Sequence, residues 1–180
     1  MELTERTLET IRVYNGRIVS LRIDTVELPD GKTANREIVE HRGAVAIVPV
    51  LDSKEIVMVR QYRQAAGEVL LEIPAGTLGQ GEDPEKCARR ELIEETGYEA
   101  REMTRLFGSY LSPGYSDEML HTYLATGLTE NLGVRDKDEF LEVVRVDIDD
   151  IMRMIQFGEI KDAKTICGCL LAECMLKHGG

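Results

Sequence analysis

The sequence predicts an α/β fold, a mixed sheet with interspersed helices, with a small antiparallel β-sheet at its N-terminus. Three observations predict it. Alternating or β-branched segments separated by turns fill the first forty residues, a continuous apolar run at 44–51 indicates a buried strand, and helical patterns are interspersed among later strand patterns. The 180 residues fit one main domain with a core of its own and a small extra element.

The N-terminal part is predicted to be antiparallel because short turns join its strands. Asn15-Gly16 and Pro29-Asp30-Gly31 supply the turn chemistry. We therefore expect an N-terminal β subdomain over residues 1–40 and a main domain over 41–180. The expected N-terminal strands cover 11–14, 18–26 and 36–41.

In the main domain, the buried strand at 44–51 is followed by the turn Asp52-Ser53-Lys54, which predicts a hairpin with the next strand. Further strands and helices are predicted from apolar periodicity. The expected strands cover 44–51, 56–62, 68–73, 103–110, 120–125 and 141–146, and the expected helices cover 84–96, 149–157 and 162–176.

The helix at 84–96 has the clearest start and stop signals. Asp83 is a good N-cap, Pro84 takes the first helical position, and Gly97 suits the left-handed residue that ends a helix. A Gly-rich loop leads into it from the strand at 68–73. We expect the loop and the helix to form one functional unit.

Three carboxylates share one face of this helix. Glu91, Glu94 and Glu95 stand at i, i+3 and i+4, where like charges repel, and the last two lie at the unfavourable end of the helix dipole. Such a cluster is stabilised by a cation, and hard carboxylate oxygens select Mg²⁺ or Mn²⁺. A solvated acidic helix face is the alternative interpretation of the three glutamates alone.

The wider spacing resembles the signature of the Nudix hydrolases, G-x5-E-x7-R-E-U-x-E-E-x-G-U with U apolar. Leu92 and Tyr98 fill the two U positions. The resemblance implies an α/β/α sandwich and hydrolysis of a diphosphate linked to a second group. The matching fixed positions are Gly76, Glu82, Arg90, Glu91, Glu94, Glu95 and Gly97.

The resemblance also assigns roles. Glu91 and Glu95 bind the metal, Glu94 is a further or water-mediated ligand, and the main-chain carbonyl of Ala75 is another ligand. The implied cofactor is Mg²⁺, with Mn²⁺ as the alternative. Glu82 is expected to hold Arg90 and the loop in place.

Residues outside the signature resemble the ADP-ribose pyrophosphatase subgroup. They include a proline sixteen positions after Gly97, the segment Arg60-Gln61-Tyr62-Arg63, the entry Glu72-Ile73-Pro74-Ala75-Gly76, and Asp162-Ala163-Lys164-Thr165. The implied products are AMP and ribose 5-phosphate. GDP-mannose or another nucleoside diphosphate sugar is the alternative substrate. The alternative outside the enzymes is a catalytically inactive Nudix domain that senses a ligand.

The subgroup resemblance supplies the remaining site residues. Arg63 is expected to contact the diphosphate, Ser112 the terminal ribose, and Arg36 and Glu37 the adenine from the partner subunit of a homodimer. An acidic loop late in the chain supplies the base that activates water, which alignment gives as Glu139, also a metal ligand, with Glu142 as the alternative. The catalytic residues are thus Glu139, Glu94 and Glu95.

The amino-acid composition limits the classes of binding partner and the cell compartment that we expect. A net charge of −11 argues against nucleic acid, whose phosphates need Lys and Arg surfaces. The charged start and the lack of a long apolar run predict a cytoplasmic protein without a membrane anchor. The four cysteines are expected to be reduced, and their spacing does not suit a zinc site.

Overall fold

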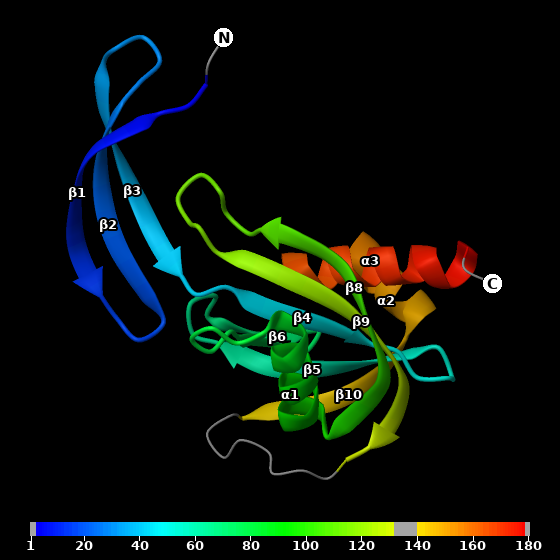
Figure 1. Ribbon diagram of the computed structural model, residues 1–180. Helices are drawn as coiled ribbons and strands as arrows, with labels where there is room; N and C mark the ends of the chain where they lie inside the picture. Colours follow the sequence, from blue (N-terminus) through cyan, green and yellow to red (C-terminus); the bar gives the residue numbers. More distant parts are fainter. Residues whose placement is uncertain (1–2, 132–139, 179–180) are drawn as a thin grey trace. The chain divides into compact units, whose positions relative to one another are not determined.

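The computed structural model describes residues 3–131 and 140–178 (Figure 1). The chain divides into two compact units, Met1–Gly43 with Ser109–Leu120, and Ala44–Gly108 with His121–Gly180. The elements follow in the order β1 (Arg6–Asn15), β2 (Val19–Glu27), β3 (Thr33–His41), β4 (Ala44–Pro49), β5 (Glu55–Arg63), β6 (Glu68–Glu72), β7 (Ala75–Thr77), α1 (Pro84–Thr96), β8 (Tyr98–Tyr110), β9 (Met119–Glu130), β10 (Leu141–Asp147), α2 (Ile148–Gln156) and α3 (Ala163–His178).

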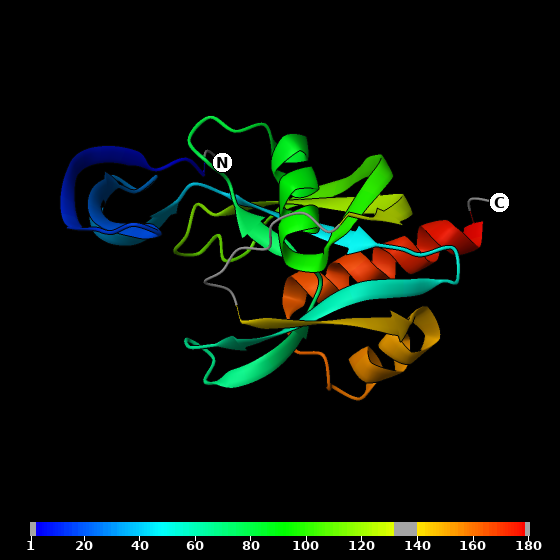
Figure 2. The same cartoon turned by 90° about the horizontal axis from the view of Figure 1, so that it is seen from below.

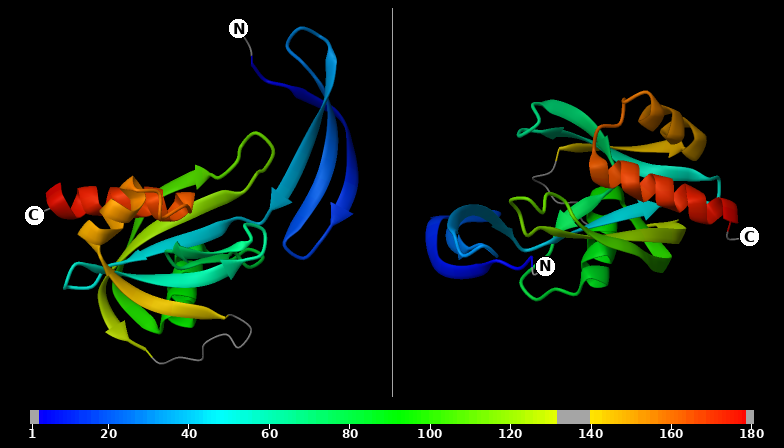
Figure 3. Two further views of the ribbon diagram at one scale, coloured as in Figure 1. Left: turned by 180° about the vertical axis from the view of Figure 1, so that it is seen from behind. Right: turned by 90° about the horizontal axis from the view of Figure 1, so that it is seen from above.

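The first unit is built on a three-stranded antiparallel sheet in the order β1-β2-β3 (Figure 3). The segment Ser109–Leu120 belongs to this unit because it bonds to β3. The Val39 N–H donates to the Tyr115 carbonyl at 2.8 Å, and the Asp117 N–H donates to the Val39 carbonyl at 3.2 Å. The loop that carries Ser112 is therefore grouped with the N-terminal strands.

The N-terminal antiparallel sheet is present as predicted, but β1 starts at Arg6 rather than at residue 11. All ten residues of β1 are exposed, so no alternation of buried and exposed positions marks its first half. One buried carboxylate, Asp24, lies in this sheet and accepts hydrogen bonds from Thr10 Oγ1 at 2.8 Å and Arg22 Nε at 3.1 Å.

The second unit is centred on β4, which is buried on both faces. Val45 and Ile47 belong to the same core cluster as Leu92 of α1, whereas Val48 lies close to Gly168 of α3. Successive strand residues point to opposite faces, so α1 and α3 cover opposite sides of β4, as Figure 2 also shows. This arrangement explains the continuous apolar run at 44–51 and confirms the predicted α/β class and helix–sheet–helix layering.

The strands of this unit form the sheets β7-β4-β9-β8 and β10-β5-β6. The three-residue strand β7 was not predicted, because Ala75-Gly76-Thr77 is too short to show any periodicity. It forms by antiparallel pairing with β4, where Val45 faces Gly76. This pairing fixes the backbone of residues 75–77, which lies beside Glu91 and Glu95 of α1.

The predicted boundaries of α1 are confirmed. The Asp83 side chain accepts a hydrogen bond from the Lys86 N–H at 3.1 Å, Pro84 starts the helix, and Gly97 has a φ of 73°. That φ lies in the left-handed region, which glycine adopts at little cost. In the described part of the chain, no helix is both long enough and apolar enough to cross a membrane.

Candidate active site

Two of the three helix carboxylates lie against the backbone of β7. An ideal Cβ built on Gly76 would come within 1.9 Å of the Glu91 Cδ, so only the absence of a side chain lets the carboxylate approach. Glu95 is 3% exposed, and its Oε2 accepts a hydrogen bond from the Ala75 N–H at 3.0 Å. The short strand therefore orients Glu91 and Glu95 toward one stretch of main chain.

Arg90 compensates much of the negative charge on this face. Its Nη1 lies 2.7 Å from Glu91 Oε1 and 2.7 Å from Glu94 Oε2. The hydrogen bonds to Glu82, and after them the charges and hydrogen bonds of Glu91 and Glu94, raise the Arg90 pKa above its ordinary value. Repulsion among the glutamates is therefore smaller than their spacing alone predicts, because the chain itself supplies a cation.

The expected role of Glu82 is confirmed. Its carboxylate accepts two hydrogen bonds from Arg90, from Nε and Nη2, each at 3.1 Å, and one from the Gly79 N–H at 2.8 Å. The Arg90 hydrogen bond, followed by the Gly79 N–H, lowers the Glu82 pKa to about 2. Glu82 thus ties the Gly-rich loop to the helix.

The chemistry of these donors fits a divalent cation of the Mg²⁺ type, because carboxylate oxygens lie beside a main chain that has its own carbonyl oxygens. The recess above Gly76, which a Cβ would fill, holds a carboxylate rather than an apolar group. Within residues 3–131 and 140–178, however, no three acidic, His or Cys side chains are gathered closely enough to hold an ion. Glu91 and Glu94 are both paired with Arg90 instead.

We expect Gly76→Ala to impair activity more than stability. The added methyl group must displace the Glu91 carboxylate, which is the end of a flexible side chain, so the free energy of unfolding should fall by only about 1 kcal/mol. The metal concentration that gives half-maximal activity should rise at least about tenfold. Metal titration of activity, with thermal unfolding of the same sample, checks both expectations. An unchanged metal requirement would contradict the role of Glu91.

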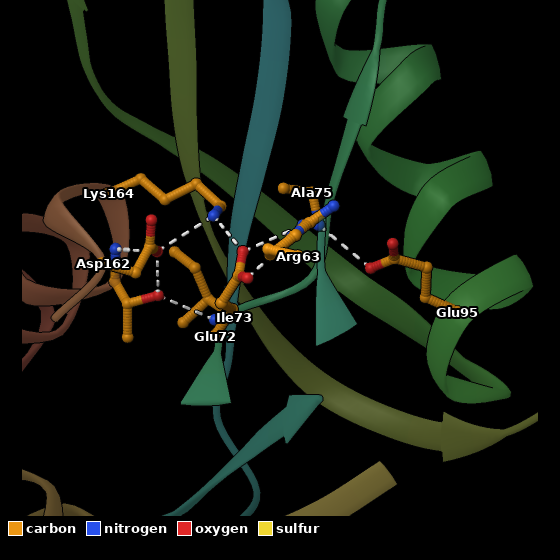
Figure 4. Close-up of polar contacts among 8 residues, drawn as sticks. Arg63, Glu72, Ile73, Ala75, Glu95, Asp162 and Lys164 are labelled. Carbon is orange, nitrogen blue, oxygen red and sulfur yellow. Dashed lines mark hydrogen bonds and ion pairs between the residues drawn. The ribbon is translucent and has the colours of Figure 1, made fainter. Parts of the chain in front are cut away.

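A second polar cluster lies where β6 ends (Figure 4). Arg63 Nε and Nη2 donate to the two carboxylate oxygens of Glu72, at 2.7 and 2.9 Å, and Lys164 Nζ also donates to Glu72 Oε2. Glu72 is 1% exposed. Burial alone raises its pKa, but Arg63 and Lys164 outweigh that effect and hold the pKa below its ordinary value. Arg63 is therefore a fixed cation, and Glu95 adds to the charge around it.

Three of the other predicted site residues belong to the first unit. Arg36 pairs with Glu5, with Nη2 to Oε1 at 2.5 Å, and Glu37 is exposed on β3. Ser112 accepts two main-chain hydrogen bonds on its carbonyl, from Tyr115 and Ser116, within the loop of the first unit.

Of the two candidates for the base, Glu139 lies outside the described residues. Glu142 is exposed on β10 and lies 3.4 Å from Arg60 Nη1.

Glu72 and Lys164 lie in segments that resemble the ADP-ribose pyrophosphatase subgroup, but the sequence predicted no role for either residue. The signal was present, because Glu72 ends the apolar stretch Val69-Leu70-Leu71 and a carboxylate there needs partners once buried. The partner Lys164 lies 92 residues along the chain, so only the tertiary structure reveals it.

Two family matches cover almost the whole chain. Residues 40–167 match the NUDIX domain, and residues 5–39 match the nucleoside diphosphate sugar hydrolase N-terminal domain. The chain belongs to the Nudix family. The matched NUDIX segment contains both the α1 carboxylates and the Glu72 cluster, and proteins of this family generally need a divalent metal.

Among the relatives of this Nudix protein is an ADP-ribose pyrophosphatase from Bacillus subtilis, 44% identical over 91% of this chain and 89% of the relative. A methanol dehydrogenase activator from Bacillus methanolicus is 45% identical over 90% of this chain and 89% of the relative. A GDP-mannose pyrophosphatase from Shigella flexneri is 35% identical over 72% of this chain and 76% of the relative. The crystal structure of an ADP compounds hydrolase shares the fold, with a TM-score of 0.88, 24% identity, and coverage of 100% of this chain and 98% of that one.

Proposed function

We propose that this Nudix hydrolase cleaves the diphosphate of ADP-ribose, or of related ADP-sugars, to give AMP and ribose 5-phosphate. The observation that carries the proposal is the 44% identity to an ADP-ribose pyrophosphatase along nearly the full length of both chains. A second ADP-ribose pyrophosphatase, from Mycobacterium tuberculosis, is 40% identical over 93% of this chain. Free cysteines in the described residues are compatible with the proposed cytoplasmic setting.

The proposed site divides the work among the residues of the second unit. Glu91, Glu94, Glu95 and the Ala75 carbonyl would hold Mg²⁺, with Mn²⁺ as the alternative. A divalent cation bound there neutralises charge on the diphosphate oxygens and makes water more acidic. Arg63 binds the diphosphate, since a guanidinium held on one edge presents its other edge to phosphate oxygens. The proposed base is Glu139, and the alternative is Glu142.

GDP-mannose or another nucleoside diphosphate sugar remains the alternative substrate. The observation that favours it is the 35% identity to a GDP-mannose pyrophosphatase, although that match covers only 72% of this chain. The relative from Bacillus methanolicus is named for activating methanol dehydrogenase, so its name does not discriminate between nucleotide sugars.

A substrate panel tests the proposal. The purified protein is incubated with Mg²⁺ and ADP-ribose, ADP-glucose, GDP-mannose or a nucleoside triphosphate, and phosphate is measured after coupling to a phosphatase. We expect ADP-ribose to have the highest kcat/KM and the triphosphate to be among the poorest substrates. Much faster turnover of GDP-mannose would establish the alternative, and no turnover of any diphosphate would refute both.

We further propose that the protein is a homodimer in which the N-terminal strands of each protomer supply Arg36 and Glu37 to the adenine pocket of its partner. Support comes from β1, an edge strand of ten residues that bonds only to β2 within the described sheet. It exposes large apolar side chains, including Ile11 at 55% and Val13 at 54%. Exposed apolar edge strands favour pairing with another chain.

The dimer proposal predicts a mass of about 40 kDa by light scattering, twice the 20.2 kDa of one chain. The double variant Ile11→Lys/Val13→Lys should shift the protein toward 20 kDa and raise the KM for ADP-ribose, because charges on an apolar contact oppose association. Glu9→Lys, which changes an exposed polar residue of the same strand, is the control. A monomeric wild-type protein with full activity would contradict the shared adenine pocket.

A further inference from the structure

We propose that Lys164, at the start of α3, is a positioning residue that fixes the guanidinium of Arg63 through Glu72. This inference rests on the proposed function, in which Arg63 binds the diphosphate. Lys164 is 12% exposed at its side chain and lies in the same cluster as the buried Glu72 (Figure 4). Nothing in the proposed reaction requires Lys164 to touch the substrate itself.

Glu72 holds Arg63 along one edge of its guanidinium. Glu72 accepts from Nε and Nη2, which form one edge of the planar guanidinium. The Arg63 side chain is 39% exposed, although Glu72 is buried. Anchoring one edge of a rigid plane fixes the direction of the other, so Glu72 decides where the remaining donors of Arg63 point.

Glu72 is itself held by a further cation, Lys164. Its Oε2 accepts from both Arg63 Nη2 and Lys164 Nζ. A carboxylate bonded to Arg63 alone could rotate together with the arginine, whereas a second cation on the opposite side gives it one orientation. Two cations also compensate the cost of burying the charge of Glu72, which one partly exposed arginine does less well.

Contacts at the start of α3 determine the position of Lys164. Asp162 Oδ2 lies 2.9 Å from Lys164 Nζ and accepts from the Thr165 N–H at 3.1 Å and from Thr165 Oγ1 at 2.5 Å. Thr165 Oγ1 in turn accepts from the Ile73 N–H at 2.9 Å. The start of α3 is therefore bonded to two consecutive residues, to Glu72 through Lys164 and to Ile73 through Thr165.

The test is Lys164→Met, which removes the ammonium but keeps a side chain of similar length. If Lys164 positions Arg63, the KM for the best substrate should rise about tenfold while kcat changes less than about twofold. A merely structural role would instead reduce the fraction of active enzyme, which lowers kcat at unchanged KM. Lys161→Met is the matched control, because Lys161 also pairs with a glutamate of β6, Glu68 at 2.7 Å, without contacting Arg63.

A double-mutant cycle identifies the residue through which Lys164 acts. In the Arg63→Ala background, Lys164→Met should change kcat/KM by less than about twofold, because its target is gone. A further tenfold loss in that background would overturn the inference. Lys164→Gln, which retains a donor for Glu72, serves if the methionine variant does not fold, and should raise KM about threefold. Absence of turnover of every diphosphate by the wild type would refute the proposed function, whereas normal turnover with an additive cycle refutes only the role of Lys164.

Discussion

Glu95→Gln is expected to lower kcat about a thousandfold in saturating Mg²⁺, because it removes the charge of a proposed metal ligand, whose contribution to the transition state is several kcal/mol. Stability should change by no more than about 1 kcal/mol, since the glutamine oxygen can still accept the hydrogen bond from the Ala75 N–H. The loss of one like charge near the C-terminal end of α1 acts in the stabilising direction.

The measurement is steady-state kinetics over a Mg²⁺ titration, with thermal unfolding on the same preparations. Glu85→Gln is the control, because Glu85 lies on the same helix but pairs with Arg89 at an exposed i, i+4 position. Excess chelator should abolish wild-type activity. Full activity of Glu95→Gln, or of the wild type in chelator, would remove the metal assignment.

Arg63→Ala is expected to lower kcat/KM for ADP-ribose about a hundredfold, because the proposed charge-assisted contacts to the diphosphate are lost, each of about 1.5–3 kcal/mol. The structure adds an expectation that the sequence did not give. Glu72 is 1% exposed and would be left with Lys164 alone, so the free energy of unfolding should fall as well. We expect the free energy of unfolding to fall by about 1–2 kcal/mol. The loss is smaller than for a fully buried ion pair, because the Arg63 side chain is 39% exposed and solvent screens its charge.

The stability loss in Arg63→Ala should depend on pH. The pKa of Glu72 is lowered in the folded protein, so its ionised form stabilises the fold above its ordinary pKa of 4.5, and this contribution is lost as the pH falls through the folded value. The difference in stability between wild type and variant should therefore be full at pH 7 and shrink below pH 4.5. Denaturant unfolding at several pH values measures it, with the exposed Arg153→Ala as the control. A difference that did not vary with pH would argue against Glu72 as the partner.

Local signals determined most of the fold. The N-cap, the proline and the terminal glycine of α1 each act within a few residues, so its boundaries could be read from the chain. The apolar run of β4 likewise signalled burial on both faces. By contrast, the first half of β1 and the three residues of β7 carry no periodicity, and pairing with β2 and β4 makes them strands.

For the site, the sequence by itself determined the family and the carboxylates, because the spacing of Glu91, Glu94 and Glu95 places them on one helix face whatever surrounds the helix. Only the tertiary structure decided how their charge is compensated. Arg90 forms ion pairs with Glu91 and Glu94, and the Ala75 N–H of β7 donates a hydrogen bond to Glu95. The tertiary structure alone also joined Glu72 to Lys164, because contacts between residues so distant in the chain depend on how β6 and α3 pack and leave no local pattern.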